Sequence, residues 1–269
     1  MISKEDIKTV EEAVRSAGKM LLVARPDEST VHAKEGPANF VTDYDVKIQE
    51  YLIERLSAVF DGAQFYGEED TAGSTGYVGD GYTFFIDPID GTTNLMFDYQ
   101  NSCVSVGLAE GGVMTAGWVF NPYTDRMYVA ASGQGATLNG RPLRITDKGM
   151  NEGIVAFGCA RYNEGDIVFS VLKEIFMNSL SVRNGGSAAI DLCRIASGSN
   201  VGYVEMKLQP YDYAAASVII EEAGGYIGQP DGSAITLDRP CPIVAGTHKA
   251  AEELKNILLS EGLTKEKGI

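Results

Sequence analysis

Apolar residues recur with a helical period in two stretches near the start of the chain. The pattern predicts one amphipathic helix from about Ser3 to Ala24 and a second from Thr42 or Asp43 to Phe60. Residues 31–39 between them show no regular period. A short strand from Ala63 to Tyr66 and a buried strand from Tyr82 to Ile86 are expected next. Between those strands, Thr71 to Gly81 is rich in Gly, Ser and Thr and predicts a mobile surface loop.

In the rest of the chain, the expected type of secondary structure changes once, at about residue 151. Turn residues separate strands predicted at 102–108, 113–120 and 126–131, and Asn139-Gly140 marks a further hairpin, so an antiparallel sheet is expected. From about residue 151, strands alternate with helices, which is typical of an α/β unit. These strands are predicted at 154–158, 181–183, 203–206 and 243–246, and the helices at 166–177, 188–196, 213–223 (opened by Asp212) and 248–260. The expected fold is α+β in a first domain, residues 1–146, and α/β in a second, residues 147–269.

Charge and cysteine content narrow the class of protein. The 269 residues include 37 acidic and 22 basic side chains, which give a net charge of −15. That excess argues against partners such as nucleic acid or an anionic membrane, which need a basic surface. The four cysteines are far apart and indicate free thiols in a reducing compartment. No apolar run is long enough for a membrane span or a signal peptide, so a cytoplasmic location is expected.

Eight residues directly after the buried strand carry the most specific chemical signal. The octet Asp87-Pro88-Ile89-Asp90-Gly91-Thr92-Thr93-Asn94 places two carboxylates three residues apart at the end of that strand. Pro88 removes a backbone donor, so we expect strand pairing to stop there. Gly91 lets the backbone approach a ligand, and the amides that follow are free to bind an anion. The octet predicts a cation on the acids and a phosphate on the amides.

Three acidic clusters need one explanation. Glu68, the Asp87/Asp90 pair and Asp212 each lie at a strand end or a helix start. Carboxylates ~4 Å apart would repel one another by about 4 kcal/mol per pair at an effective dielectric constant of roughly 20. Divalent cations would remove this repulsion, and oxygen ligands without His or Cys favour Mg²⁺ or Mn²⁺. The clusters therefore predict a shared metal site.

Three motifs resemble the signatures of the inositol monophosphatase family, and the resemblance covers nearly the whole chain. They are Gly67-Glu68-Glu69, the octet, and Asp212-Tyr213-Ala214-Ala215. Tyr211 departs from the pattern, because the family usually has Trp there. The family belongs to the Mg²⁺-dependent, lithium-sensitive phosphatases with the fructose-1,6-bisphosphatase fold. The resemblance thus implies a layered α-β-α-β-α sandwich and a homodimer.

The resemblance also implies a role for each site residue. Glu68, Asp87 and the Ile89 carbonyl would hold one Mg²⁺, and Asp87, Asp90 and Asp212 a second. A third, looser ion near Glu68 would have Lys34 nearby. For catalysis, Thr92 and Asp45 would orient or activate the attacking water, together with Glu68. The amides of Gly91 and Thr92 would hold the phosphate, and Asp90, Ala188 and Glu205 would contact the alcohol portion of the substrate.

For several of these residues a plainer reading stays open. Asp45 could be only a helix cap, and Lys34 only a solvated loop lysine. Glu205 could pair with Lys207 or Arg183. By register, Glu69 or Asp70 could take the role of Glu68.

The implied activity is hydrolysis of a small phosphate monoester, inositol 1-phosphate to inositol and phosphate, by a metal-activated water. One alternative is the same chemistry on fructose-1,6-bisphosphate, a nucleoside 3′,5′-bisphosphate, NADP or histidinol phosphate. A bisphosphate would need a cationic pocket, for which Arg161 and Arg183 are the candidates. A further alternative is a regulatory binding protein that retains the metal site.

Overall fold

The computed structural model describes residues 2–25, 30–33, 40–69, 73, 79–159 and 165–260, without the side chains of residues 165–168. Lys34, Asp70, Arg161 and most of the predicted loop from Thr71 to Gly81 lie outside the described residues. Within the described part, no helix combines the length and the apolar content that crossing a bilayer requires.

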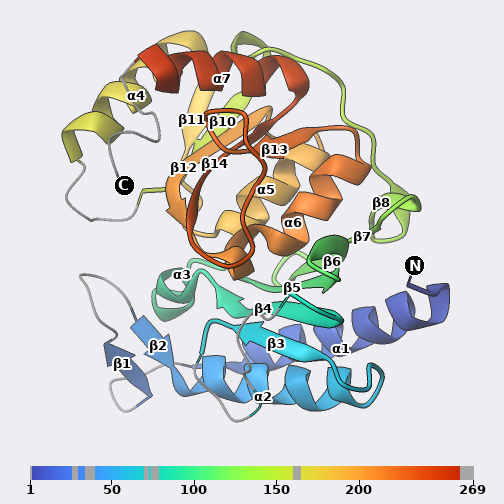
Figure 1. Cartoon of the computed structure of the whole chain (residues 1–269). Helices are drawn as coiled ribbons and strands as arrows, with labels where there is room; N and C mark the ends of the chain where they lie inside the picture. Colours follow the sequence, from blue (N-terminus) through green and yellow to red (C-terminus); the bar gives the residue numbers. More distant parts are fainter. Residues whose placement is uncertain are drawn as a thin grey trace.

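Two helices and a seven-stranded sheet form the first two layers (Figure 1). Helices α1 (Lys4–Val23) and α2 (Asp43–Ser57) follow the predicted periods closely. In the sheet, β3 is parallel to β4 and all other neighbours are antiparallel. Its strands, in spatial order, are β3 (Gln64–Gly67), β4 (Tyr82–Asp90), β5 (Cys103–Glu110), β6 (Val113–Asn121), β7 (Arg126–Ala131), β8 (Gly135–Leu138) and β9 (Arg141–Pro142). One face of this sheet buries Ile86 and Trp118 against α1 and α2.

The second half builds a five-stranded sheet with helices on both faces. The strands, in spatial order, are β11 (Ser181–Arg183), β10 (Ile154–Phe157), β12 (Gly202–Leu208), β14 (Cys241–Gly246) and β13 (Tyr226–Gly228). The outer helices are α4 (Gly165–Asn178) and α7 (His248–Ser260), and the inner ones are α5 (Ala188–Ala196) and α6 (Pro210–Glu222). The predicted alternation of strands and helices is confirmed. Helix α6 begins at Pro210, because proline suits a first helical turn, so Asp212 lies inside that turn rather than before it.

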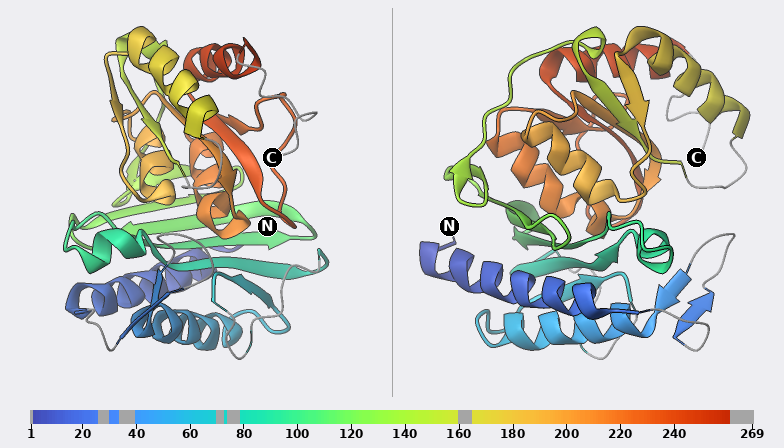
Figure 2. Two further views of the ribbon diagram at one scale, coloured as in Figure 1. Left: turned by 90° about the vertical axis from the view of Figure 1, so that its left-hand side faces the viewer. Right: turned by 180° about the vertical axis from the view of Figure 1, so that it is seen from behind.

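Helices α5 and α6 form a middle layer that both sheets contact (Figures 1 and 2). The predicted α-β-α-β-α sandwich is therefore confirmed. Helix α6 lies directly on the first sheet, since a Cβ added to Gly117 would be 2.1 Å from the carbonyl oxygen of Ala215. The two halves share this core. The domain boundary between residues 146 and 147, which falls between β9 and the short helix η1 (Met150–Glu152), stays a prediction.

One prediction about the octet is wrong, and the error matters for the site. Strand pairing does not stop at Pro88, because β4 continues to Asp90. Asp87 lies opposite Ser105, and Asp90 lies opposite Cys103, so three steps on β4 match two on β5. This bulge accommodates the missing N–H of Pro88. It also brings Asp90 to the same face of the sheet as Asp87, where regular alternation would have separated them.

Sequence reasoning missed three of the short strands. Strands β1 (Val31–Ala33) and β2 (Phe40–Thr42) form an antiparallel pair, although residues 31–39 were expected to be irregular. Strand β13 was not predicted either. Each has three residues, which is too short to display a strand period.

Candidate functional site

Asp87 and Asp90 lie at the bulge with side chains only 2% and 8% exposed. The N–H of Ile89 donates to Asp87 Oδ1 at 3.1 Å, and the Ile89 carbonyl accepts from Thr92 Oγ1 at 3.2 Å. Gly91 adopts φ = +96°, and an added Cβ would lie 3.0 Å from the backbone carbonyl oxygen of residue 186. Glycine thus makes the tight turn that places Thr92, the first residue of α3 (Thr92–Met96), beside the two carboxylates.

Asp90 caps the N-terminus of α5, which comes from the other half of the chain. Its carboxylate accepts hydrogen bonds from Ser187 Oγ at 2.5 Å, from the Ala189 N–H at 2.7 Å and from the Ala188 N–H at 3.2 Å. Burial raises the pKa of Asp90 to about 6, and these hydrogen bonds oppose the rise. A helix N-terminus favours a negative charge. Asp90 therefore joins the two halves at the site.

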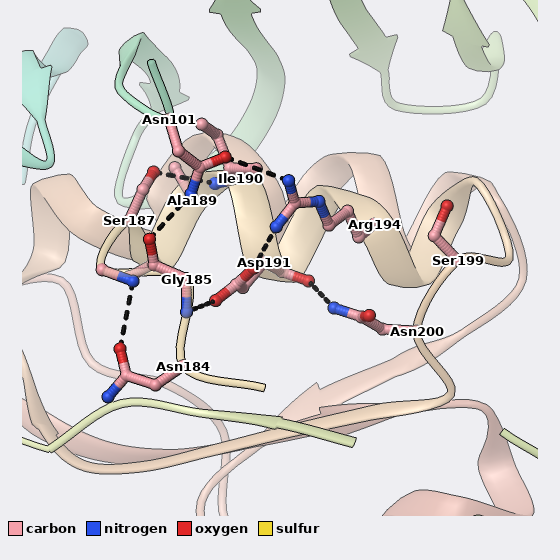
Figure 3. A network of polar contacts seen from close by, with 12 residues as sticks. Asn101, Asn184, Gly185, Ser187, Ala189, Ile190, Asp191, Arg194, Ser199 and Asn200 are labelled. Carbon is pink, nitrogen blue, oxygen red and sulfur yellow. Dashed lines mark hydrogen bonds and ion pairs between the residues drawn. The ribbon is translucent and has the colours of Figure 1, made fainter. Parts of the chain in front are cut away.

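The loop before α5 is held by side chains from both halves (Figure 3). Asn94 and Asn101 donate to the carbonyl of Gly185 at 2.8 and 2.7 Å. Arg194 donates to Asn101 Oδ1 at 3.0 Å and to Asp191 Oδ1 at 2.7 Å. Asp191 in turn accepts from the N–H of Gly185 at 2.9 Å. In the loop that leads into α5, hydrogen bonds thus fix both the N–H and the carbonyl of Gly185.

Asp45 is a helix cap and also a neighbour of the octet. Its Oδ2 accepts from the N–H and the hydroxyl of Thr42 at 2.7 and 2.6 Å, which forms the capping box of α2. Its Oδ1 accepts from Thr92 Oγ1 at 3.3 Å. Burial raises the pKa of Asp45 to about 7; the Thr42 hydrogen bonds oppose the rise, and the charges of Glu68 and Glu69 add to it. The capping reading is correct, but it accounts for only one of the two carboxylate oxygens.

Both glutamates after β3 face Asp45. The three residues offer carboxylate oxygens that all lie within 4.8 Å of one another. Glu69 is buried and Glu68 is half-buried. Gln49 of α2 fixes this turn, because it accepts from the Glu69 N–H at 3.0 Å and donates to the Glu69 carbonyl at 2.6 Å. Both glutamates, Glu68 and Glu69, therefore belong to the cluster.

Asp212 approaches the same cluster from the first turn of α6, where its Oδ2 accepts from the N–H of Gln209 at 2.7 Å. Burial raises the pKa of Asp212 well above its ordinary value, and the charges of Asp90 and Glu68 add to the rise. Burial has the same effect on Asp87, to which the charges of Glu68, Asp90 and Asp212 contribute. These mutual effects follow from proximity. The three acidic clusters that are separate in the sequence converge in space.

This donor set fits a hard divalent cation. It consists of the carboxylates of Glu68, Asp87, Asp90 and Asp212 with the carbonyl of Ile89, all of them oxygen ligands. Buried carboxylates with raised pKa values are costly to ionise unless a cation compensates them. In addition, the buried hydroxyl of Ser105 has no hydrogen-bond partner in the described structure, and it lies opposite Asp87.

A pocket of about 220 Å³ opens beside Asp90 and Asp212. Ala188 and Glu205, the other two residues expected to contact the alcohol, both line it. Glu205 accepts a hydrogen bond from the Tyr203 hydroxyl, a partner that the sequence did not suggest. Burial raises the pKa of Glu205 to about 7, and the bond from Tyr203 opposes the rise. None of the described residues that line the pocket is cationic.

The structure thus assembles every predicted site residue that it describes, and Lys34 lies outside the described residues. Their roles stay predictions. Sequence reasoning missed the supporting residues Gln49, Asn101 and Arg194, which act on backbone groups far away in the chain and belong to no motif. Tyr211, the departure from the family pattern, packs against Tyr66 with ring centroids 6.1 Å apart, so an aromatic contact is present beside Asp212.

Comparisons with known proteins agree with one another. Residues 3–261 match the model of the inositol monophosphatase family. An inositol-1-monophosphatase of Bacillus subtilis is 31% identical over 235 residues, which are 87% of this chain and 88% of the relative. A Nus factor SuhB of Xylella fastidiosa is 28% identical over 274 residues, with 98% of both chains covered. The crystal structure of the extragenic suppressor protein suhB from Bartonella henselae superposes with a TM-score of 0.86 at 27% identity, covering 99% of this chain and 100% of that one.

Proposed function

Since this chain belongs to the inositol monophosphatase family, we propose that it hydrolyses inositol 1-phosphate to inositol and phosphate with Mg²⁺ as cofactor. The observation that carries the proposal is the convergence of Asp87, Asp90 and Asp212 with Glu68 beside a pocket that Glu205 lines. Carboxylates alone at such density would repel one another, so the arrangement is stable only with cations or protons between them.

Each residue has a place in this proposal. Glu68, Asp87 and the carbonyl of Ile89 would hold one Mg²⁺, Asp87, Asp90 and Asp212 a second, and the region of Glu68 a third, weakly held ion; Mn²⁺ could substitute. Bound Mg²⁺ lowers the pKa of a water ligand and neutralises charge on the phosphate. Thr92 and Asp45, already hydrogen-bonded to each other, orient the attacking water and hold its proton at Asp45 Oδ1. The amides of Gly91 and Thr92 bind phosphate oxygens.

The lining of the pocket supports a monophosphate of a polyol over a bisphosphate. A second phosphate would need cationic partners, and the described lining includes the acids Asp191 and Glu205 instead. Arg183, one of the two candidate cations, is exposed and donates to the hydroxyl of Ser181 and the carbonyl of Val182. Carboxylates suit sugar hydroxyls, which donate hydrogen bonds to them.

A substrate panel tests the proposal. The purified chain with Mg²⁺ is assayed for phosphate release from inositol 1-phosphate, fructose-1,6-bisphosphate, a nucleoside 3′,5′-bisphosphate, NADP and histidinol phosphate, ranked by kcat/KM. We expect inositol 1-phosphate to rank first and millimolar lithium to inhibit. Asp90→Asn should lower kcat/KM by at least about 10²-fold, since it removes an anionic ligand from the Mg²⁺ site that activates the attacking water. Asp61→Asn, which removes an exposed charge after α2, is the matched control. Wild-type turnover in Asp90→Asn would refute the metal role.

The similarity to a Nus factor SuhB favours a second candidate, a regulatory protein that acts through a partner and retains the metal site. The net charge of −15 argues against direct contact with RNA, so the partner would be a protein. A stable complex that survives Asp90→Asn would support this function, and loss of the complex together with activity would argue against it.

The same family membership underlies two further parts of the proposal. We expect a homodimer, and we expect a cytoplasmic location, in keeping with four free cysteines of which three are buried.

A further inference from the structure

Two buried side-chain oxygens in the described part of the chain have no hydrogen-bond partner. They are the hydroxyls of Ser105 and Tyr226. Buried polar groups in folded proteins are almost always paired, so an unpaired one calls for an explanation such as an ion or water that binds there. Ser105 is fully buried on β5, and no role has been assigned to it so far.

Ser105 belongs to the face of the first sheet that carries the acidic cluster. It lies opposite Asp87, and Cys103, two residues earlier on the same face, lies opposite Asp90. Directly opposed residues of an antiparallel pair have side chains on the same face, a few ångströms apart. Helix α6, which carries Asp212, covers this face, since a Cβ added to Gly107 would lie 2.9 Å from the N–H nitrogen of Ala215. The hydroxyl of Ser105 is therefore enclosed between the strand of Asp87 and the helix of Asp212.

The two neighbours on this face behave differently. Cys103 donates its thiol to Asp90 Oδ2, with 3.6 Å between sulfur and oxygen. Ser105, which has the equivalent position beside Asp87, has a better donor and yet no partner. An apolar residue of the same size would suit this place if packing were its only task.

We propose that Ser105 is a positioning residue for the cation site, whose hydroxyl hydrogen-bonds to the oxygen atoms around the bound ion. Those oxygens belong to Asp87 and to water molecules of the ion. Groups that orient metal ligands in this way typically account for about ten- to a hundredfold in metal affinity. The inference rests on the proposed function, because it presupposes that Asp87 holds Mg²⁺.

Tyr226 provides a matched control. Its hydroxyl is the other unpaired group, but it lies on β13, the edge strand that β14 separates from β12 and Glu205. Lys255 lies over its ring, with 4.7 Å from Nζ to the ring centroid. Removal of either hydroxyl relieves an unpaired buried group, and only one of the two belongs to the cation site.

The experiment measures Mg²⁺ affinity and metal-free stability on the full chain. Wild type, Ser105→Ala, Ser105→Cys and Tyr226→Phe are freed of metal with EDTA, melted, and titrated calorimetrically with Mg²⁺ in the presence of inorganic phosphate. Ser105→Ala and Tyr226→Phe should each raise the metal-free Tm by about 2 °C or more. Ser105→Ala alone should weaken the Mg²⁺ Kd by at least about tenfold. Ser105→Cys keeps the shape with a larger and weaker donor, and its Mg²⁺ Kd should fall between those of wild type and Ser105→Ala.

The outcomes separate the two proposals. A wild-type Kd in Ser105→Ala, with wild type binding Mg²⁺ and hydrolysing substrate, would overturn the inference and leave the proposed function intact. No Mg²⁺ uptake by wild type would overturn both. If Ser105 only supported packing, both its variants would have a lower metal-free Tm, and excess Mg²⁺ would not restore activity. If it positions ligands, excess Mg²⁺ restores kcat in Ser105→Ala.

Discussion

Two carboxylates at this site each bind more than one partner. A role inferred from the neighbouring sequence alone is therefore incomplete for both of them. Asp45 completes the capping box of α2 with one oxygen and meets Thr92 with the other. Asp90 is a predicted cation ligand and also the cap of α5. A carboxylate has two oxygens with about four lone-pair sites, so structural and chemical roles are compatible.

Substitutions of Thr92 can show how much its hydroxyl contributes to catalysis. Its Oγ1 donates toward Asp45 and toward the Ile89 carbonyl, at 3.3 and 3.2 Å. Thr92→Val keeps the shape and removes the hydroxyl, and it should lower kcat by about 10² or more, since a group that handles the proton of the water is lost. Thr92→Ser keeps the hydroxyl and should stay within a few-fold of wild type. Equal rates in the two variants would argue against a role for the hydroxyl.

Glu205 should make the metal-free protein sensitive to pH. Its pKa is raised to about 7 by burial, against roughly 4.3 in an unfolded chain. The folded state therefore holds the proton more tightly, and the stability linked to it is fully present below about pH 4 and lost as pH rises through about 7, by at most about 1.4 kcal/mol per pH unit. In EDTA, the Tm of wild type should fall from pH 5 to pH 8. Glu205→Gln should have a shallower slope, and an unchanged slope would contradict the assignment.

At the scale of elements, the acidic side chains of the site are positioned by the ends of strands and the first turns of helices. The bulge in β4 turns Asp90 toward Asp87, and the N-termini of α5 and α6 meet that strand end. Helix α6 can approach only because β5 and β6 carry glycine where it crosses them. The position of Asp212 thus depends on residues that touch no ligand.

Gly117→Ala tests this dependence. The added Cβ would meet the backbone of Ala215 at 2.1 Å, so α6 must shift. Such overpacking typically costs about 1–3 kcal/mol, which corresponds to a Tm lower by at least about 2 °C, and Mg²⁺ affinity should fall because Asp212 moves with the helix. Val113→Ala, an exposed position on the same strand, should change neither quantity. A stable Gly117→Ala protein with normal Mg²⁺ affinity would contradict this account.

At the scale of the whole molecule, the expected homodimer has a candidate contact face. Exposed apolar side chains gather on the outer helix α4 and the residues after it, namely Phe169, Phe176, Met177 and Leu180. Two copies that each carry −15 repel one another, so self-association requires a patch with few acids. Helix α4 is the yellow helix at the top of the left view of Figure 2.

Met177→Asp places a charge in that patch and should convert a dimer to a monomer, as measured by light scattering after size-exclusion chromatography. Burying an unpaired carboxylate in an interface is costly. Leu259→Asp makes the corresponding change at an exposed position on α7 and should leave the dimer intact. Dimers in both variants would exclude the α4 face.

Local patterns were sufficient to predict most of the fold and the acidic composition of the candidate site. Helical periods, turn residues and the three acidic motifs are short-range properties, so the boundaries of α5 and α7 and the acidic residues of the candidate site could be predicted from them. Long-range packing decided the rest. The register of β4 on β5, the capping of α5 by Asp90, the hold of Gln49 on Glu69 and the unpaired hydroxyl of Ser105 all join residues far apart in the chain. No local period encodes which strand lies opposite a given residue, because that depends on how the layers pack.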